Sequence, residues 1–447
     1  MHSSRRNFIK TATGSALAAP WIGWKSTSAG AAPSKELRFA NFGAAGRAWN
    51  DFSEMLKVPN TTCVAVAEVD TARATKLQKA HPDTKIYQDW RRLLDEVGDQ
   101  IDAVVVGTPD HMHAPIAISA MQLGLHVYCE KPLTRTLHEC RTARELAAEK
   151  NLTTQMGIQI ASTSGNRTGV KLLQEGVIGK VLEVHSMNPK SWGSMAPLPD
   201  TEEPPPATLN WDEWIGVSKM TKFIPREYHP SQWRKRIGYG TGTLGDMGCH
   251  IYHPWFMGLN MPETLSVTSL GPAPVDDHSW PLDSKVHYRM KGNAQTDGDF
   301  DFTWYDGKQR VSEEAISHVG GLENMIKSGT LVIGTEGALT ISHSGSGGAA
   351  KIFRDGQPSD EAIEQEPSDH HHTNFASAIR GEISEKPRTN FDYAGPMTEA
   401  VLQGTVALRL PGEELKWDAA SGKFTNSDAA NKLVHDPYRE GWEVKGV

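Results

Sequence analysis

Apolar runs that alternate with helical stretches over the first third of the chain constrain the fold more than any other feature. The runs occupy residues 37–42, 62–67, 101–107 and 127–130. A chain that alternates in this way builds a parallel sheet with helices on both faces, because each helix returns the chain to the same edge. We therefore predict an α/β fold in which residues 34–155 form a doubly wound parallel sheet.

The first strand ends in a glycine-rich turn, GAAGRA, at residues 43–48. On the G-x-G-x-x-G/A template Gly43 takes the first position, Ala45 the second and Ala48 an allowed third. Such a turn receives a pyrophosphate on backbone N–H groups and a helix N-terminus. An ordinary strand–helix turn is the alternative, because the methyl group of Ala45 stands where the backbone should approach phosphate. The predicted cofactor-binding residues are Gly43, Ala45, Gly46 and Arg47.

Two acidic residues follow the second strand. Glu68 and Asp70 stand about 25 residues beyond the glycine turn, where dinucleotide-binding proteins place the carboxylate that binds the adenosine ribose. A carboxylate there accepts from two ribose hydroxyls and repels a 2′-phosphate. We therefore expect NAD in preference to NADP, with Glu68 as the better candidate and Asp70 as the start of an acidic helix.

The third strand ends at Thr108 and Pro109, which we predict to lie against the cofactor. His111 and His113 follow, but no carboxylate or cysteine cluster completes a metal site, so both are predicted to cap a helix or pack on the cofactor. The triplet at residues 370–372 is predicted to cap a helix or to lie at the surface, since adjacent histidines cannot all face one metal. No metal is predicted.

The fourth strand ends in Glu130, Lys131 and Pro132. Proline bars the preceding residue from helical geometry, so Lys131 is expected to be extended at the carboxyl end of the strand, where doubly wound sheets bind ligands. Beside the positive ring of an oxidised nicotinamide, burial and like charge would lower the pKa of Lys131 and suit it to proton transfer. Taken alone, Glu-Lys-Pro is more often a surface turn.

A second stretch that carries chemistry is GTGTLGDMGCH at residues 240–250. If a helix begins here, Asp246 and His250 lie on one face because they are four residues apart. Alcohol oxidation needs a carboxylate that binds a hydroxyl beside an imidazole that removes its proton. The alternative is an aspartate that caps the helix with a packed histidine.

Beyond residue 155 the pattern changes to short alternating runs, most clearly between residues 263 and 341. Such alternation predicts an antiparallel sheet with one buried face. Residues 156–447 are therefore predicted to form a second domain. Residues 188–240 are rich in proline and tryptophan. Their rings either stack on sugar faces from exposed loops or pin a long loop by burial. These tryptophans are Trp192, Trp211, Trp214 and Trp233.

The N-terminal sequence has the features of an export signal. SRRNFIK at residues 4–10 precedes a short apolar run, which is typical of a twin-arginine signal over residues 1–33. No apolar run is long enough for a permanent membrane span. The net charge of the chain is −8. The first 33 residues contain four cationic side chains and no acidic one, so residues 34–447 carry a net charge of −12. An acidic body argues against nucleic acid as a partner. We expect export in the folded state and a periplasmic protein.

Four cysteines lie in four different predicted elements, at Cys63, Cys129, Cys140 and Cys249. They show no paired spacing and no Cys-x-x-Cys. We therefore expect buried free thiols, which a protein exported in the folded state can keep.

In these motifs the chain resembles the Gfo/Idh/MocA oxidoreductase superfamily, and within it a secreted branch with twin-arginine signals. The resemblance implies an NAD(P)-dependent oxidoreductase with a Rossmann domain and a C-terminal α/β domain whose mostly antiparallel open sheet commonly forms dimers or tetramers. A homodimer or homotetramer is therefore expected. The resemblance rests on Gly43 with Arg47, Thr108 and Pro109, residues 130–132 and 242–250, and the tail pieces 391–396, 417–418 and 438–442.

The resemblance also implies roles for three residues. His250 would take a sugar hydroxyl proton, Lys131 would hydrogen-bond the same oxygen, and Asp246 would position the ring while hydride passes to nicotinamide. Two departures are that Ala45 replaces the usual second glycine and that His253 stands where many relatives have an acid.

The leading prediction is an NAD-dependent oxidoreductase acting on a sugar, polyol or glycoside, its small-molecule partner. Because the periplasm offers little free NAD, the cofactor is expected to be exported tightly bound and recycled in the site. One alternative is a glycosidase that works by transient oxidation and elimination of the aglycone. The other is a non-catalytic sugar-binding relative, which the imperfect glycine turn favours.

Overall fold

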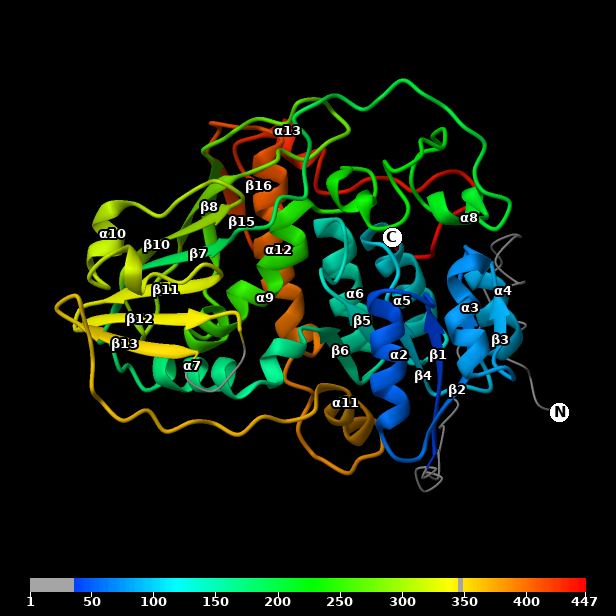
Figure 1. Ribbon diagram of the computed structural model, residues 1–447, viewed down its shortest axis with the longest axis horizontal. Coiled ribbons are helices and arrows are strands. Elements are labelled where there is room, and N and C mark those ends of the chain that lie inside the picture. The colour runs from blue at the N-terminus through cyan, green and yellow to red at the C-terminus, as the bar shows by residue number, and fades with distance from the viewer. Residues whose placement is uncertain (1–35, 345–348) are drawn as a thin grey trace, which may run out of the picture.

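The computed structural model describes residues 36–344 and 349–447. The predicted twin-arginine signal, residues 1–33, lies outside the described residues. Figure 1 shows two sheets side by side, with the helices α9 (Gly242–Gly258) and α12 (Phe391–Leu408) between them. No helix in residues 36–344 or 349–447 combines the length and apolar character needed to cross a membrane.

The N-terminal sheet has six parallel strands in the order β3-β2-β1-β4-β5-β6. The chain changes direction across the sheet between β1 and β4, which leaves a crevice at the carboxyl ends of the strands. This confirms the predicted Rossmann sheet. β6 continues to Gly157, so the predicted boundary at residue 155 falls inside this strand. The strands are β1 (Leu37–Phe42), β2 (Thr61–Ala67), β3 (Lys85–Tyr87), β4 (Ala103–Val106), β5 (His126–Glu130) and β6 (Thr154–Gly157).

Side chains at the helix starts explain where these helices begin. Asp70 accepts a hydrogen bond from the backbone N–H of Ala72 at 3.1 Å, so it caps its helix as the sequence suggested. Thr136 and Glu139 form a reciprocal capping box. The helices of this domain are α2 (Arg47–Lys57), α3 (Thr71–Ala80), α4 (Trp90–Val97), α5 (His113–Gln122) and α6 (Leu137–Glu149).

The C-terminal sheet has ten strands in the order β14-β13-β12-β11-β7-β10-β9-β8-β15-β16. Only β7 and β10 pair in parallel, so the predicted mostly antiparallel sheet is confirmed. The strands are β7 (Val181–Asn188), β8 (Thr264–Ser269), β9 (Lys285–Met290), β10 (Thr296–Asp306), β11 (Gly329–Gly334), β12 (Gly337–Ser342), β13 (Ala350–Arg354), β14 (Gln357–Pro358), β15 (Leu415–Asp418) and β16 (Lys423–Phe424).

Helices cover one face of this sheet. α7 (Ser164–Gln174) contacts β12 and β13, α9 contacts β7, β10 and β11, and α12 contacts β8 and β9. α12 also packs on α6 of the Rossmann domain, which fixes the two sheets relative to each other. α9 is buried almost throughout, with Tyr252 and Trp255 fully covered. A buried helix therefore carries the predicted Asp246 and His250.

The segment between β7 and α9 arches over the carboxyl edge of the Rossmann sheet (Figure 1). It is attached there by a hydrogen bond from the backbone N–H of Asn210 to the carbonyl of Val69. Trp211 and Trp214 stack with ring centroids 4.7 Å apart in a buried aromatic cluster. These two tryptophans therefore pin the segment, whereas Trp192 is half-buried beside α9.

The histidine triplet differs in part from its prediction. His370 caps α11 (His371–Ile379) by accepting from the backbone N–H of Thr373, as expected. His371 and His372 are buried, however, so the surface assignment was wrong for them. His371 contacts the carbonyl of Met156, and His372 stacks on Tyr128 with centroids 4.8 Å apart. The helix docks on the Rossmann domain, which residue spacing did not reveal.

The cysteines match their prediction. All four are free thiols, and three of them are buried. Burial raises the pKa of the Cys63 thiol to about 12, so it stays protonated.

Candidate active site

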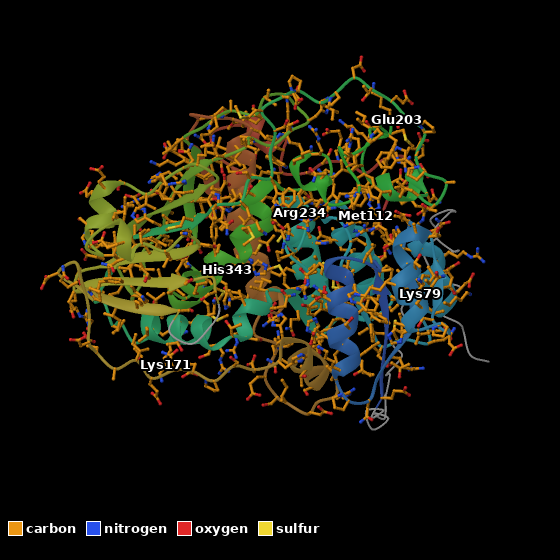
Figure 2. The ribbon with its side chains drawn as sticks, in the orientation of Figure 1. Lys79, Met112, Lys171, Glu203, Arg234 and His343 are labelled. Atoms are coloured by element: carbon orange, nitrogen blue, oxygen red, sulfur yellow. The ribbon has the colours of Figure 1, made fainter. Side chains whose placement is uncertain are left out.

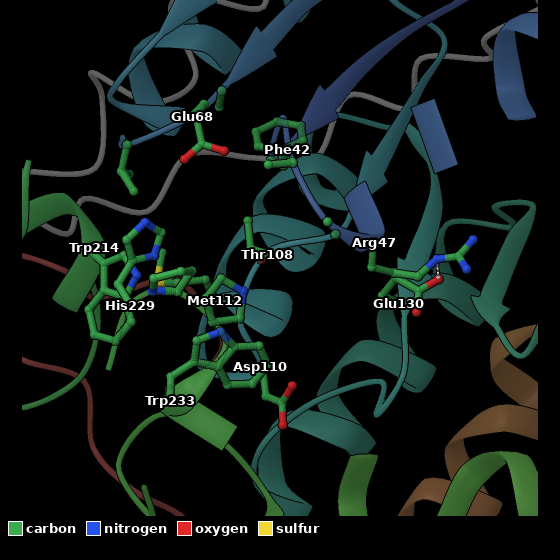
Figure 3. Close-up of a pocket in the computed structure, with 18 of the residues that line it drawn as sticks. Phe42, Arg47, Glu68, Thr108, Asp110, Met112, Glu130, Trp214, His229 and Trp233 are labelled. Carbon is green, nitrogen blue, oxygen red and sulfur yellow. Dashed lines mark ion pairs between the residues drawn. The ribbon is translucent and has the colours of Figure 1, made fainter. Parts of the chain in front are cut away.

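A cavity with an empty volume of about 1080 Å³ opens at the carboxyl ends of β1, β2, β4 and β5 (Figure 3). The segment between β7 and α9 forms its outer wall through Trp214, His229 and Trp233. The cavity therefore lies where a doubly wound sheet binds ligands, and it is covered from the second domain.

The glycine turn forms one end of the cavity. Gly43 has φ +100°, and a Cβ there would lie 2.7 Å from the Cβ of Ala48, so this position needs glycine. Gly46 has φ +62° and precedes α2 without a side-chain cap, which leaves the N–H groups of the first turn available. Ala45 also lines the cavity. These features fit a phosphate group at the helix N-terminus.

Arg47, the first residue of α2, forms ion pairs within the protein. Its guanidinium binds Asp51 at 2.6 Å and lies 3.4 Å from the carboxylate of Glu130 (Figure 3). Burial opposes the charge of Glu130 and raises its pKa to about 7, although Arg47 acts against this shift. Arg47 and Glu130 both line the cavity, and their ion pair ties α2 to the end of β5.

Glu68 follows β2 and directs its carboxylate towards the cavity (Figure 3). It accepts from the backbone N–H of Ala44 at 2.9 Å and from that of Asp70 at 3.1 Å. Burial raises the pKa of Glu68, and these two hydrogen bonds oppose the rise. The carboxylate is therefore fixed next to the glycine turn, as expected for a group that binds a ribose.

The end of β4 contributes Thr108 and Pro109 to the cavity wall. The buried hydroxyl of Thr108 has no partner within the described residues. His113 contacts the carbonyl oxygens of Pro132 at 2.7 Å and Thr108 at 2.9 Å, so its ring links the ends of β4 and β5. His111 packs on Trp214 and contacts its carbonyl oxygen at 2.9 Å, away from the cavity wall.

Lys131 lines the cavity and forms an ion pair with Asp246 of α9. The Nζ of Lys131 lies 2.8 Å from the Oδ1 of Asp246, and both side chains are about nine-tenths buried. Asp246 lies in the second turn of α9, so it is not the helix cap that was the alternative. The carboxyl end of β5 therefore faces α9, as the pairing of the two motifs predicted.

Three cations surround the carboxylate of Asp246. Besides Lys131, the Nε of Arg234 lies 3.1 Å from Oδ1 and the Nζ of Lys190 lies 3.2 Å from Oδ2. The indole N–H of Trp192 also donates to Oδ2 at 2.9 Å. Burial opposes ionisation, but the cations, Lys131 foremost, hold the pKa of Asp246 well below its usual range.

The lowered pKa that we expect for Lys131 beside an oxidised nicotinamide is not a property of the protein alone. Burial lowers the pKa, as predicted, but the charge of Asp246 at 2.8 Å raises it by more. The net result is a raised pKa. Lys131 is therefore a stable cation and a hydrogen-bond donor.

His250 lies one turn after Asp246 on α9, as predicted. Burial and the neighbouring charge of Lys131 hold its pKa well below the usual range, so the ring is neutral at physiological pH. Its Nδ1 has no partner within the described residues. The ring of His343, which follows β12, lies 5.4 Å away between centroids.

Sequence reasoning missed Lys190, Arg234 and His343. Lys190 and Arg234 lie in the long segment between β7 and α9, and His343 follows a strand of the far sheet. No motif marked them, and only tertiary folding brings them to α9. His253, the noted departure, contacts the hydroxyl of Tyr393 at 2.8 Å and packs α9 on α12. Within residues 36–344 and 349–447 no group of three His, Cys, Asp or Glu is arranged to hold a metal.

The N-terminal domain matches a known family. The model of the oxidoreductase family with an NAD-binding Rossmann fold matches residues 37–158. The chain is 26% identical to levoglucosan dehydrogenase of Pseudarthrobacter phenanthrenivorans over 186 residues, which is 42% of this chain and 40% of that protein. The chain thus spans less than half the length of this curated relative.

Solved structures extend the likeness to both domains. An inositol dehydrogenase homolog from Azotobacter vinelandii, complexed with NADH and myo-inositol, has a TM-score of 0.60 at 17% identity. The match covers 86% of this chain and 98% of that one. An aldose-aldose oxidoreductase from Caulobacter crescentus, complexed with glycerol, has a TM-score of 0.58 at 15% identity, over 86% and 100% of the two chains.

At these identities the solved structures show a shared fold. The family match adds sequence similarity for the domain that carries the glycine turn, Glu68 and Lys131. Residues 37–158 therefore match the Gfo/Idh/MocA model of the oxidoreductase family with an NAD-binding Rossmann fold, and the solved structures show that the fold of both domains is shared with known proteins.

Proposed function

We propose that the protein is an NAD-dependent oxidoreductase that oxidises a hydroxyl group of a sugar, polyol or glycoside. The observation that carries this proposal is that Lys131 lines the same cavity as the glycine turn and pairs with Asp246, with His250 one turn further along α9. Levoglucosan dehydrogenase and the inositol dehydrogenase homolog, by their names, act on carbohydrates and polyols, which supports this class of substrate.

The cavity suits a dinucleotide. The turn at Gly43 and Gly46 would hold the pyrophosphate, and Glu68 would accept from the adenosine ribose. The unpartnered hydroxyl of Thr108 offers a further hydrogen bond near the nicotinamide end. When bound, NAD supplies the hydride acceptor for alcohol oxidation. We infer NAD in preference to NADP because a second negative charge beside Glu68 would be repelled.

Residues of the protein can remove the proton that the substrate hydroxyl loses on oxidation. His250 is neutral and has an unpartnered ring nitrogen, so it can accept the proton of the substrate hydroxyl. Lys131 is held as a cation by Asp246, so it stabilises the developing charge on that oxygen and does not remove the proton. Asp246 in turn holds Lys131 and Arg234 in place.

We further infer that the cofactor stays bound through repeated turnovers. Trp214, His229 and Trp233 close the cavity from the segment that crosses the sheet edge. Enclosure of this kind slows release of a dinucleotide. A retained cofactor fits the expected export through the twin-arginine route into the periplasm, and it implies that one substrate is oxidised while another is reduced. A homodimer or homotetramer is expected from the family resemblance.

The test is to purify the protein without added nucleotide, denature it, and identify what is released by chromatography and absorbance. Stoichiometric NAD or NADH would support a retained cofactor, and NADH formation with added sugars would then support the oxidoreductase. A protein that releases no nucleotide, binds no added NAD and turns over no sugar would contradict the proposed function. It would leave a sugar-binding role.

A further inference from the structure

The ion-pair cluster around Asp246, which adjoins the cavity at Lys131 and Arg234, carries more positive than negative charge. Asp246 is shared by Lys131, Lys190 and Arg234, all within 3.2 Å, which leaves two cations in excess. Two further carboxylates lie near these cations, but burial raises the pKa of Asp110 and raises that of Glu130 to about 7, which disfavours their charged forms, and Glu130 also pairs with Arg47. A bound oxidised nicotinamide would add a further positive charge.

Arg234 has an open hydrogen-bonding edge. Its Nε binds Asp246, but its two terminal nitrogens have no partner within the described residues. The guanidinium lies over the ring of Trp233 at 4.2 Å and near that of Trp192 at 5.5 Å, so its position is fixed by stacking. Figure 2 shows Arg234 between the two domains, where it lines the cavity.

Lys190 is the third cation that contacts Asp246. It follows β7 and reaches the second oxygen of Asp246, while 51% of its side chain remains exposed. Lys190 therefore combines a fixed direction with an accessible ammonium group. An arginine with an open edge and a lysine across from it form a typical anion-binding pair.

We propose that the substrate is an anionic sugar, whose carboxylate or phosphate is bound by Arg234 and Lys190 while the hydroxyl to be oxidised lies between Lys131 and His250. This inference rests on the proposed function of the same site. A neutral sugar would leave the two excess cations uncompensated in a partly buried site, which is unfavourable. An anionic group bound by the guanidinium of Arg234 compensates the excess positive charge and orients the sugar ring.

The experiment compares matched sugars on the protein with its nucleotide bound. D-glucose, D-glucuronate and D-glucose 6-phosphate form one set, and D-galactose, D-galacturonate and D-galactose 6-phosphate form a second. Binding to the NADH-loaded protein is measured by calorimetry, and NADH formation is measured on the NAD-loaded protein. We expect at least one anionic class to bind about tenfold more tightly than its neutral sugar, as for one charge-assisted bidentate contact.

Comparison of the two anionic classes identifies the group. Preference for the uronates assigns a carboxylate, and preference for the 6-phosphates assigns a phosphate. Arg234→Met and Lys190→Met are expected to reduce the preference about tenfold and to weaken its dependence on salt. Lys291→Met is the matched control, because Lys291 is similarly exposed and binds one carboxylate, Glu263 at 2.9 Å, outside the cavity. It should leave the preference unchanged.

Three results would overturn the inference. If neutral sugars bind as tightly as both anionic classes, the inference of an anionic substrate is wrong, but the oxidoreductase proposal still stands. Loss of bound NAD in Arg234→Met, with unchanged sugar preference, would assign Arg234 to the cofactor. Absence of nucleotide binding together with absence of turnover of every sugar would contradict the proposed function and this inference with it.

Discussion

The two ends of the cavity are built in different ways. The cofactor end comes from strand ends and turns that are local in sequence, with Gly43, Glu68 and Thr108 all inside one domain. At the other end, Lys131 and Arg234 join Lys190 around the carboxylate of Asp246, so residues of both domains meet there, and His250 follows one turn further along α9. Local sequence motifs therefore determine the positions of the residues at the first end, and the docking of the two domains determines those at the second. Variants can therefore separate cofactor binding from chemistry.

The largest effect is expected from His250→Gln, which removes the proton acceptor but keeps the side-chain size. We expect kcat to fall about 10²- to 10⁴-fold with the nucleotide content unchanged. The control is His253→Gln, one turn further along α9, where the side chain contacts Tyr393 outside the cavity. Steady-state kinetics and nucleotide analysis decide the outcome. Equal losses in both variants would assign His250 a packing role.

Lys131→Met tests the electrostatics of the same end. His250 must be neutral to accept a proton, so activity is lost as the pH falls through its pKa. Lys131 helps to lower that pKa, so its removal should raise it and move the acidic limb of kcat/KM to higher pH. We also expect kcat to fall about 100-fold, because a charge that stabilises the transition state is gone. An unmoved acidic limb would mean that His250 is not the titrating group.

The same contrast explains what the sequence could predict. The parallel sheet, the glycine turn, Glu68 and Lys131 follow from runs of contiguous residues whose periodicity and turns fix their place. Asp246 and His250 were predictable as a pair because four residues on a helix share a face. Docking of the domains, in contrast, decides the positions of Lys190, Arg234 and His343. It also buries His371 and His372, and it places Asp246 beside Lys131, which raises the pKa of that lysine.

Gly43→Ala tests the cofactor end. The new methyl group would lie 2.7 Å from the Cβ of Ala48 at a φ of +100°, so the turn must shift. A strained residue of this kind costs about 1–3 kcal/mol, and we expect a comparable loss of NAD affinity, about 10- to 100-fold. Gly381→Ala is the control, because it also has positive φ but an open surrounding and no place in the cavity. Unchanged nucleotide content in Gly43→Ala would contradict a phosphate site at this turn.

Glu68→Gln and Glu68→Ala sharpen the assignment of the ribose end. Both remove the negative charge, but only glutamine keeps an oxygen that can accept from the backbone N–H of Ala44. We expect the preference for NAD over NADP to fall about tenfold in both, since repulsion of the 2′-phosphate is lost. The measurement is kcat/KM with each nucleotide on protein stripped of its own. If only the alanine variant changes, the hydrogen bond to the turn matters and the charge does not.

The smallest effect is expected from Ala45→Gly, which restores the second glycine of the dinucleotide template. Gly43 and Gly46 have positive φ, but Ala45 is not among the described residues with positive φ, so its backbone needs no glycine. Its side chain is a single methyl group at the cavity wall. We therefore expect NAD affinity to change by less than about threefold, within 0.7 kcal/mol. A tenfold gain would mean that this methyl group holds phosphate away from the turn, and the cofactor end would then be weakened by a single side chain.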